Sequence, residues 1–280
     1  MLYYQLRNEL WKLFGKKRTY IGFGMCLLAE GLIVLLFRFA NGPRRELVHQ
    51  IEMMGYSSQK FVTNLTVATG VMVPVAFLLL PLYVALVGGD LMAKEAEDGT
   101  LRMILSRPIS RLRLVTTKWM AGAIFSIVLV LVFGGFGIAF ASLFFPSGAL
   151  YGMMPVDHIL AVFEQAEGWQ HYIAATLMLS VNAITIMSLA WMFSCCNIKP
   201  AAATILALSL MLISRVIQDI PYFHEWQQWF FTYHLSVWMK MFEKTFPIPA
   251  IVQSVSILCG INLTFIIIGA SIFQMRDIKS

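Results

Sequence analysis

The stretch "LTVATGVMVPVAFLLLPLYVALVGG", residues 65–89, carries no charged side chain over its whole length. About 20 consecutive, mostly apolar residues are enough for a helix to cross the hydrocarbon core of a bilayer. The stretch therefore predicts a membrane-spanning helix. Its two prolines, Pro74 and Pro81, each remove a backbone hydrogen bond, so we expect a kink or a local opening within this span.

The rest of the chain has the same character. Hydrophobic residues make up 59% of the 280 residues and charged residues only 13%, and the mean hydropathy is +0.73. Soluble domains carry about 25% charged residues. The length criterion marks six spans, roughly at residues 20–40, 65–89, 118–145, 172–194, 200–218 and 250–274. They predict an all-α integral membrane protein with a single domain over residues 1–280.

The formal net charge of +6 does not indicate nucleic-acid binding, because the basic residues cluster in short segments beside the spans. Such clustering is typical of cytoplasmic loops in membrane proteins. With an inside amino terminus, six spans place both termini in the cytoplasm. Arg44 and Arg45 fit this topology poorly, since it puts them outside. The first span holds Glu30 and Arg38 and is followed by no small-residue cleavage pattern, so we expect no cleavable signal peptide.

Residues 1–18 predict an amphipathic helix that lies in the headgroup layer. Apolar side chains at positions 2, 6, 10, 13 and 14 share one helical face, and polar side chains at 5, 8, 9, 12 and 16 lie opposite. This segment is too polar to span a bilayer but suits its surface. The basic run at 16–18 would anchor it on anionic lipid. A merely solvated amino terminus is the alternative.

Two segments fall outside the membrane on the far side. Residues 146–171 indicate a loop with acids but no Arg or Lys. Residues 221–249 contain ten aromatic residues, and Trp and Tyr prefer the membrane interface. We expect one or two short helices there, in the outer leaflet. The alternative is an aromatic-rich cap that packs on the chain's own spans.

The densest charge lies between spans two and three, in "EAEDGTLRMILSRPISRLRLVTTKW", residues 95–119. Asp98, Gly99 and Thr100 form a helix-start signal, because a short polar side chain can cap the exposed N–H groups of a following helix. Pro108 ends that helix, since proline disfavours helix at the residue before it. Ser110 is placed to cap a new helix that runs into span three.

The short helix predicted here is amphipathic, with Leu101, Ile104 and Leu105 on one face. An exposed apolar face of this kind needs a partner, either lipid headgroups or another protein. From the residues alone, the segment is also explained as a charged anchor that fixes the membrane topology.

This loop resembles the cytoplasmic loop of ABC-2-type transporter permeases, which commonly reads as a Glu, Gly-Thr, an apolar pair, Pro, Ser-Arg and a downstream Lys. The matching positions here are Glu95 or Glu97, Gly99, Thr100, Leu101, Leu105, Pro108, Ser110, Arg111 and Lys118. The amino-terminal helix, the six spans, the outer aromatic segment and the ending "FQMRDIKS" (273–280) are also similar to that family.

The resemblance implies the membrane subunit of an ATP-driven exporter in a bacterial cytoplasmic membrane, with a hydrophobic or amphipathic cargo. It implies a second permease copy or a sister subunit, and two ABC ATP-binding subunits docked underneath. Residues 95–113 would be the coupling segment, with Ile104 and the matched residues contacting the ATPase. ATP and Mg²⁺ would bind to the partner, because "GKK" at 15–17 lacks the rest of a phosphate loop. We therefore expect no enzyme activity and no cofactor in this chain.

Glu30 lies near the middle of the first span, where an ionised side chain costs at least about 2.5 kcal/mol. It should therefore face the bundle interior, be protonated, or pair, and Asn182 in span four is a candidate hydrogen-bond partner. We expect Glu30 and Asn182 to line the translocation path or the subunit interface. A purely structural hydrogen bond is the alternative.

Other chemistry is sparse. The five His show no metal-ligand spacing, and the 17 Met are spread along the chain, which favours apolar packing over a copper site. We expect neither a metal site nor catalytic residues. Two further classes of protein stay open: an ion-gradient-driven secondary transporter, which predicts matching broken spans in two halves, and a non-transporting membrane anchor of a complex.

Overall fold

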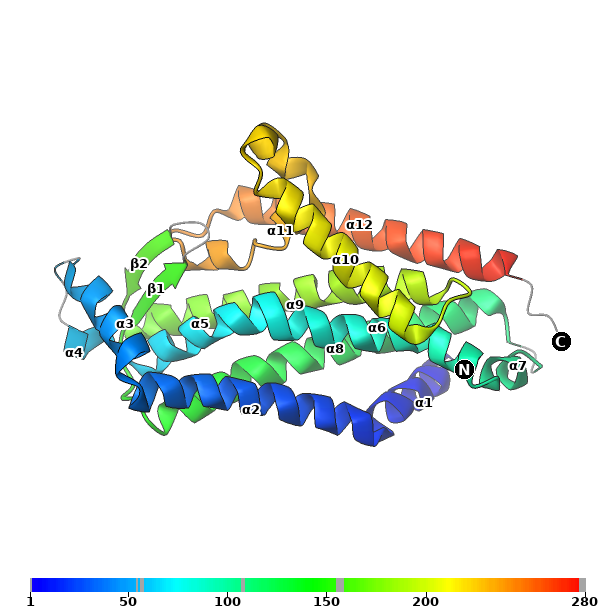
Figure 1. Cartoon of the computed structure of the whole chain (residues 1–280), viewed down its shortest axis with the longest axis horizontal. Coiled ribbons are helices and arrows are strands. Elements are labelled where there is room, and N and C mark those ends of the chain that lie inside the picture. The colour runs from blue at the N-terminus through cyan, green and yellow to red at the C-terminus, as the bar shows by residue number, and fades with distance from the viewer. Residues whose placement is uncertain (1, 54, 56–57, 107–108, 155–158, 277–280) are drawn as a thin grey trace.

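The computed structural model describes residues 2–53, 55, 58–106, 109–154 and 159–276, which form an elongated bundle of helices (Figure 1). Among these residues, six helical segments are long and apolar enough to cross a membrane, and all six overlap the predicted spans. They are α2 (Lys17–Phe39), α5 to α6 (Asn64–Pro74 and Leu80–Glu97), α8 (Arg111–Ser142), α9 (Gln165–Ser194), α10 (Pro200–Gln218) and α12 (Ile248–Met275).

The second span is continuous but widens in its middle. Between α5 and α6, residues Val75–Leu79 form a π-helical turn, η1, in which the N–H of Leu80 donates to the carbonyl of Val75, five residues back. Pro74 and Pro81 flank this turn, and neither has an N–H to continue the regular ladder. The local opening predicted from the two prolines is therefore confirmed.

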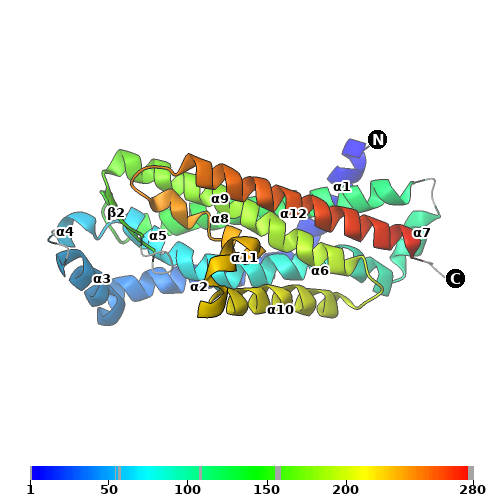
Figure 2. The ribbon, with the colours of Figure 1, turned by 90° about the horizontal axis from the view of Figure 1, so that it is seen from above.

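Helix α9 lies at the centre of the bundle, where it contacts α6, α8, α10 and α12. Its Trp191 is fully buried. Gly88 of α6 lies so close to α9 that a Cβ there would stand 2.6 Å from the carbonyl oxygen of Met187. Helices α2 and α12 lie on opposite sides of the bundle in Figure 1, and α10 lies along one edge in Figure 2. All three expose large apolar side chains, such as Leu28, Leu212 and Ile267. Lipid or another subunit must cover these outer faces.

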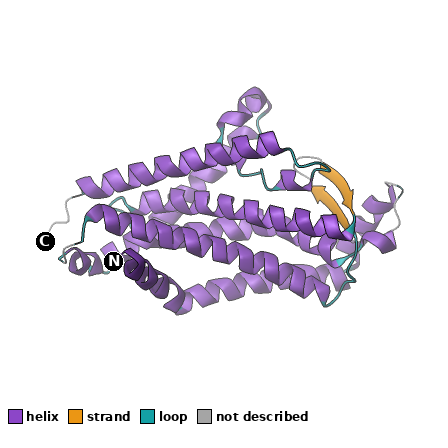
Figure 3. Ribbon diagram, turned by 180° about the vertical axis from the view of Figure 1, so that it is seen from behind, coloured by secondary structure: helices purple, strands orange, loops and turns teal. Residues whose placement is uncertain are grey.

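The two ends of the bundle differ. Helices α1 (Leu2–Gly15) and α7 (Thr100–Leu105) lie at the end where α12 finishes (Figure 1). The opposite end carries α3 (Asn41–Met53), α4 (Ser58–Phe61) and the strands of the described chain, as Figure 3 shows. Both termini therefore approach the same end of the bundle, in agreement with an even number of spans.

The loop predicted at 146–171 is wrong. Strands β1 (Leu150–Met154) and β2 (Ile159–Phe163) form an antiparallel hairpin, with Leu150 opposite Phe163, and α9 already begins at Gln165. The hairpin is fixed to α5, because the N–H of Tyr151 donates to the Thr66 hydroxyl at 3.0 Å. Its short apolar runs fold as strands because they pack on the bundle, a tertiary contact that the local sequence does not reveal.

The aromatic segment after α10 holds short helices, as predicted: η2 (Pro221–Trp229), α11 (Phe231–His234) and η3 (Met239–Phe242). Its second half is buried against the chain's own spans, since α11 contacts α10 and α12 and η3 contacts α9. Its first half exposes Tyr222, Trp226 and Trp229. The second half thus matches the alternative of a cap on the chain's own helices.

Candidate functional site

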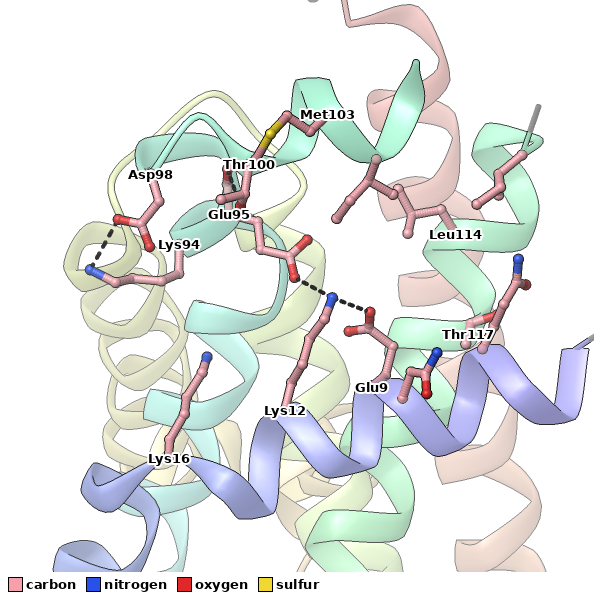
Figure 4. Close-up of a pocket in the computed structure, with 14 residues that line it drawn as sticks. Glu9, Lys12, Lys16, Lys94, Glu95, Asp98, Thr100, Met103, Leu114 and Thr117 are labelled. Carbon is pink, nitrogen blue, oxygen red and sulfur yellow. Dashed lines mark hydrogen bonds and ion pairs between the residues drawn. The ribbon is translucent and has the colours of Figure 1, made fainter. Parts of the chain in front are cut away.

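A cleft of about 600 Å³ lies where α1, the end of α6, α7 and the start of α8 meet (Figure 4). Charged side chains at its rim come from Lys16, Lys94 and Asp98. Apolar side chains that line it include Ile104 and Leu114. A cleft with charged edges and apolar walls is suited to a segment of another protein, whose charges fix its register.

Helix α1 forms one wall of the cleft. Leu13 is buried and Phe14 packs against Phe125, with ring centroids 5.4 Å apart. This packing turns the polar face of α1 toward α6 and α8. The predicted amphipathic helix is confirmed as a helix, but its polar face is covered in part: Glu9 is only 9% exposed, whereas Lys12 and Lys16 stay exposed.

Glu9, Lys12, Glu95 and Lys118 form a charge cluster, and the first three of them also line the cleft. The Nζ of Lys118 lies 2.8 Å from Glu9 Oε2 and 2.8 Å from Glu95 Oε1. The Nζ of Lys12 lies 2.7 Å from Glu9 Oε1 and 3.2 Å from Glu95 Oε1. Two carboxylates and two ammonium groups thus alternate and link three helices, α1, α6 and α8; Figure 4 shows the part made by Lys12.

The cluster keeps its groups ionised although it is largely buried. Burial by itself would raise the pKa of Glu9, but the attraction and hydrogen bonds of Lys118 and Lys12 outweigh it and hold this pKa below its ordinary value of 4.5. Burial would likewise lower the pKa of Lys12, but the hydrogen bonds and charges of Glu9 and Glu95 raise it above 10.5. Buried charges are tolerated when they are paired in this way.

The turn between α6 and α7 depends on Gly99, which has a φ of +71°. Asp98 ends α6, because its N–H donates to the Lys94 carbonyl at 2.9 Å and its carboxylate lies 3.6 Å from Lys94 Nζ. The helix start predicted at Asp98, Gly99 and Thr100 is confirmed, since α7 begins at Thr100, but Asp98 itself belongs to the end of α6. The reason is that a residue with positive φ closes the preceding helix.

Helix α7 buries one face and exposes the other. Leu101 is 2% exposed and Ile104 is half-buried against the core, whereas Met103 is 67% exposed. The hydroxyl of Thr100 donates to the Glu95 carbonyl at 3.3 Å, which ties α7 to α6. Leu105 is the last residue of α7; its side chain lies outside the part of the chain that the structure describes, and so does Pro108.

The start of α8 is tied to two other segments. The Ser110 hydroxyl accepts from the N–H of Arg113 at 3.3 Å, which confirms the predicted cap. Arg111 donates to the carbonyl oxygens of Gln274, at 3.0 Å, and Arg276, at 2.9 Å.

The Arg276 side chain donates in turn to the carbonyl of Cys196, at 3.4 Å, and to the side chain of Asn197. The start of α8, the end of α12 and the turn before α10 are thereby connected.

The comparison with known protein families decides the identity. A family model described as "ABC-2 family transporter protein" matches residues 5–219, which include every wall of the cleft. The chain belongs to this ABC-2 family. It is therefore the membrane subunit of an ABC transporter, a multi-pass permease of a family that associates with ABC ATP-binding subunits. A search among curated proteins gave no match.

Within this ABC-2 permease, the predicted coupling residues do not all lie together. Glu95 and Lys118 meet in the charge cluster, and Thr100 and Ile104 line the cleft beside it. Glu97 is exposed and lies 3.7 Å from Lys94.

The two polar residues predicted for the translocation path lie apart. Glu30 is 4% exposed and faces Gly137, where a Cβ would stand 2.5 Å from Glu30 Oε1. Its other carboxylate oxygen has no hydrogen-bond partner. Asn182 donates to the carbonyl of Leu235 instead of pairing with Glu30.

Sequence reasoning missed Glu9, Lys12 and Arg276 as site residues. Glu9 and Lys12 stood on the polar face of α1, three residues apart, which is the spacing of a helical ion pair. The available signal was Lys118, because a lysine at the beginning of an apolar span requires a nearby acid. Among the described residues, no group of three His, Cys, Asp or Glu side chains is placed to hold a metal ion.

Proposed function

We propose that the cleft is the docking site of an ATP-binding subunit. Two permease subunits, either identical or sister chains, would form an export pathway for a hydrophobic or amphipathic molecule. Each would carry one ATPase at its cleft, and ATP and Mg²⁺ would bind on those partners. The proposal places the chain in a bacterial cytoplasmic membrane with both termini inside.

The observation that carries this proposal is the charge cluster beside the exposed face of α7. A force applied to α7 would reach α6 directly. The two helices are joined by a tight turn at Gly99, and the Thr100 hydroxyl forms a hydrogen bond with the Glu95 carbonyl across that turn. Glu95 then connects through Lys118 to α8 and through Lys12 to α1. A partner docked on α7 would therefore move three helices together.

A second connection supports transmission toward the far side of the bundle. Arg111 holds the end of α12, and Arg276 holds the turn that precedes α10. Motion at the start of α8 would thus reach α10 and α12, two helices whose outer faces are exposed. Exposed helices that can be displaced are suited to forming a path between two subunits.

Helix α1 also supports a position at the membrane surface. Tyr3, Tyr4 and Trp11 are exposed, at 68%, 62% and 76%. Such side chains prefer the interface between lipid and water. We therefore propose that α1 lies in the inner leaflet with this aromatic face toward lipid, while its polar face holds the charge cluster.

Of the two polar residues predicted for the path, Asn182 has the better support. It lines a cavity beside η1 and α10, whereas Glu30, on α2, is enclosed by residues of α5, η1, α8 and α9 of its own chain. Family membership favours this ATP-driven function over a secondary transporter. A non-transporting anchor would not need the connections from α7 to α10 and α12.

The test is affinity purification of the tagged chain from its native membrane in mild detergent, with identification of co-purifying proteins and an assay of ATP hydrolysis. Met103→Asp changes an exposed side chain on α7 without disturbing the buried Leu101. Leu143→Asp is the matched control, because Leu143 is 74% exposed just beyond the other end of α8.

We expect a stoichiometric ABC ATPase with the unaltered chain and with Leu143→Asp, and its loss with Met103→Asp. A chain that purifies without any ATPase under several conditions would contradict the proposed function. Retention of the ATPase by Met103→Asp would contradict the docking site.

A further inference from the structure

A second cavity, of about 140 Å³, lies inside this one subunit, where η1, α9, α10 and the outer aromatic segment meet. It is separate from the cleft and shares no lining residue with it. Its walls include Phe77, Asn182, Leu212, Arg215 and Trp238. These side chains come from four elements that are far apart in the sequence, so the cavity is formed by the fold and not by one helix.

Asn182 lines this cavity and carries an unsatisfied acceptor. The residue is 4% exposed, and its Nδ2 donates to the carbonyl of Leu235. Its Oδ1 is buried and has no hydrogen-bond partner. A buried acceptor without a donor costs about 1–3 kcal/mol. A ligand that carries an O–H or N–H group would remove this cost if its donor reached Oδ1.

Arg215 supplies positive charge to the same cavity. It stands in the last turn of α10, with its guanidinium 5.9 Å from the centroid of the Phe77 ring. Its Nε lies 3.6 Å from Asp219 Oδ2, and Asp219 is 62% exposed on its side chain. A solvent-exposed ion pair at this distance is weak. The Arg215 guanidinium can therefore still bind an anionic group of a ligand.

The apolar surroundings define where the rest of the ligand would lie. Trp238 is 1% exposed and forms an inner wall, whereas Leu212 is 60% and Phe77 39% exposed. The mouth therefore lies at Leu212 and Phe77, beside the exposed apolar face of α10. The π-helical turn η1 contains Phe77 and sets its position at this mouth. A polar group inside and an apolar chain outside satisfy both environments.

We propose that this cavity binds the headgroup of an anionic amphiphile that also carries a hydroxyl or amide donor, with its apolar chain lying along α10. The donor would meet Asn182 Oδ1 and the anionic group would meet Arg215. This inference rests on the proposed function for the claim that the ligand is the cargo. The binding itself requires no ATPase and can be measured on the permease alone.

The experiment measures equilibrium binding of radiolabelled 1-oleoyl-lysophosphatidylglycerol to the full chain in a maltoside detergent. Lysophosphatidylcholine, whose headgroup carries a compensating cation, tests the charge requirement. Glycerol phosphate, which has no acyl chain, tests whether the apolar part of the ligand is needed for binding. The variants are Asn182→Leu and Arg215→Gln. Asn262→Leu is the matched control, because Asn262 is also buried with an unpartnered Oδ1 but lies outside this cavity.

We expect each cavity variant to weaken binding of the lysophosphatidylglycerol at least tenfold, and Asn262→Leu to leave it within twofold. We expect both comparison ligands to bind at least tenfold more weakly than the lysophosphatidylglycerol. Equal binding by Arg215→Gln, which changes a partly exposed residue and should fold, would overturn the proposal, as would equal binding of either comparison ligand. If an ABC ATPase co-purifies but the lysolipid does not bind, only this inference fails.

Discussion

The Lys118 side chain is 2% exposed and lies between the carboxylates of Glu9 and Glu95. A lysine in such a place is tolerated only because both neighbours are acids and Lys12 balances the second negative charge. The net charge of the cluster is therefore zero. An intact buried cluster of this kind adds little to stability, but loss of one member leaves an uncompensated charge. The arrangement thus favours one position of α1 against α6 and α8 over any other.

Lys118→Met should destabilise the permease by about 3–5 kcal/mol, because Glu9 and Glu95 would then face each other across a largely buried space. Thermal unfolding in detergent measures this loss. Lys199→Met is the matched control: Lys199 is exposed before α10, so its replacement should change stability by about 0.5 kcal/mol or less. Similar effects of the two variants would show that Glu9 and Glu95 do not depend on Lys118 for their burial.

The attachment of α1 should depend on pH in two separate ranges. The pKa of Glu9 lies below 4.5, so its contribution is present above 4.5 and is lost as the pH falls through the lower folded-state value. The pKa of Lys12 lies above 10.5, so its contribution is full below 10.5 and is lost as the pH rises through the higher value. Amide hydrogen exchange of residues 2–15, corrected for intrinsic rates, should therefore be slowest between these ranges. Glu9→Gln should abolish the acid-side change, and its persistence would assign that change to another group.

At the scale of elements, α7 is short and depends on the turn before it. Gly99→Ala should destabilise this turn by about 1–2 kcal/mol, because a Cβ is strained at a φ of +71°. Gly135→Ala is the control, since Gly135 lies in the interior of α8 with nothing within 4 Å of its Cβ position. That change should be neutral or stabilising by up to about 1 kcal/mol. Thermal unfolding and ATPase co-purification measure both variants, and an unchanged stability of Gly99→Ala would mean that the turn tolerates a Cβ at this position.

The spans could be predicted because each depends on its own apolar length, and the opening at η1 because Pro74 and Pro81 act locally. The cap at Ser110 is likewise a local signal. Helix α3 and the hairpin β1–β2 could not be predicted with the same method, since Leu150 and Phe163 become strand residues only through their packing. The charge cluster was out of reach for a similar reason: Glu9 and Lys118 are 109 residues apart in the sequence, and no local pattern joins them.

At the scale of the whole molecule, the permease concentrates its connections at one end. The charge cluster joins α1, α6 and α8, while Arg111 and Arg276 join α8, α12 and the turn before α10. The two sets meet on α8, which carries both Arg111 and Lys118. Helix α8 is therefore the element through which a displacement of α7 would spread to the other spans. The far end, with α3 and the hairpin, shares none of these contacts.

Arg111→Gln and Arg276→Gln should weaken this spread without removing the ATPase. Both side chains bond to backbone or amide oxygens near the surface, so each loss should cost about 1 kcal/mol in stability. We expect the ATPase to co-purify in normal amount with both variants, but export by the complex to fall severalfold for each ATP hydrolysed. The two arginines belong to the same connection, because Arg111 contacts the Arg276 backbone and the Arg276 side chain contacts the turn before α10. Loss of either one breaks that connection, so the double variant should export little less than either single variant. Arg45→Gln, on α3 at the far end, should export normally. Additive losses would mean that the two contacts act independently, and loss of the ATPase itself would place Arg111 in the docking surface instead of behind it.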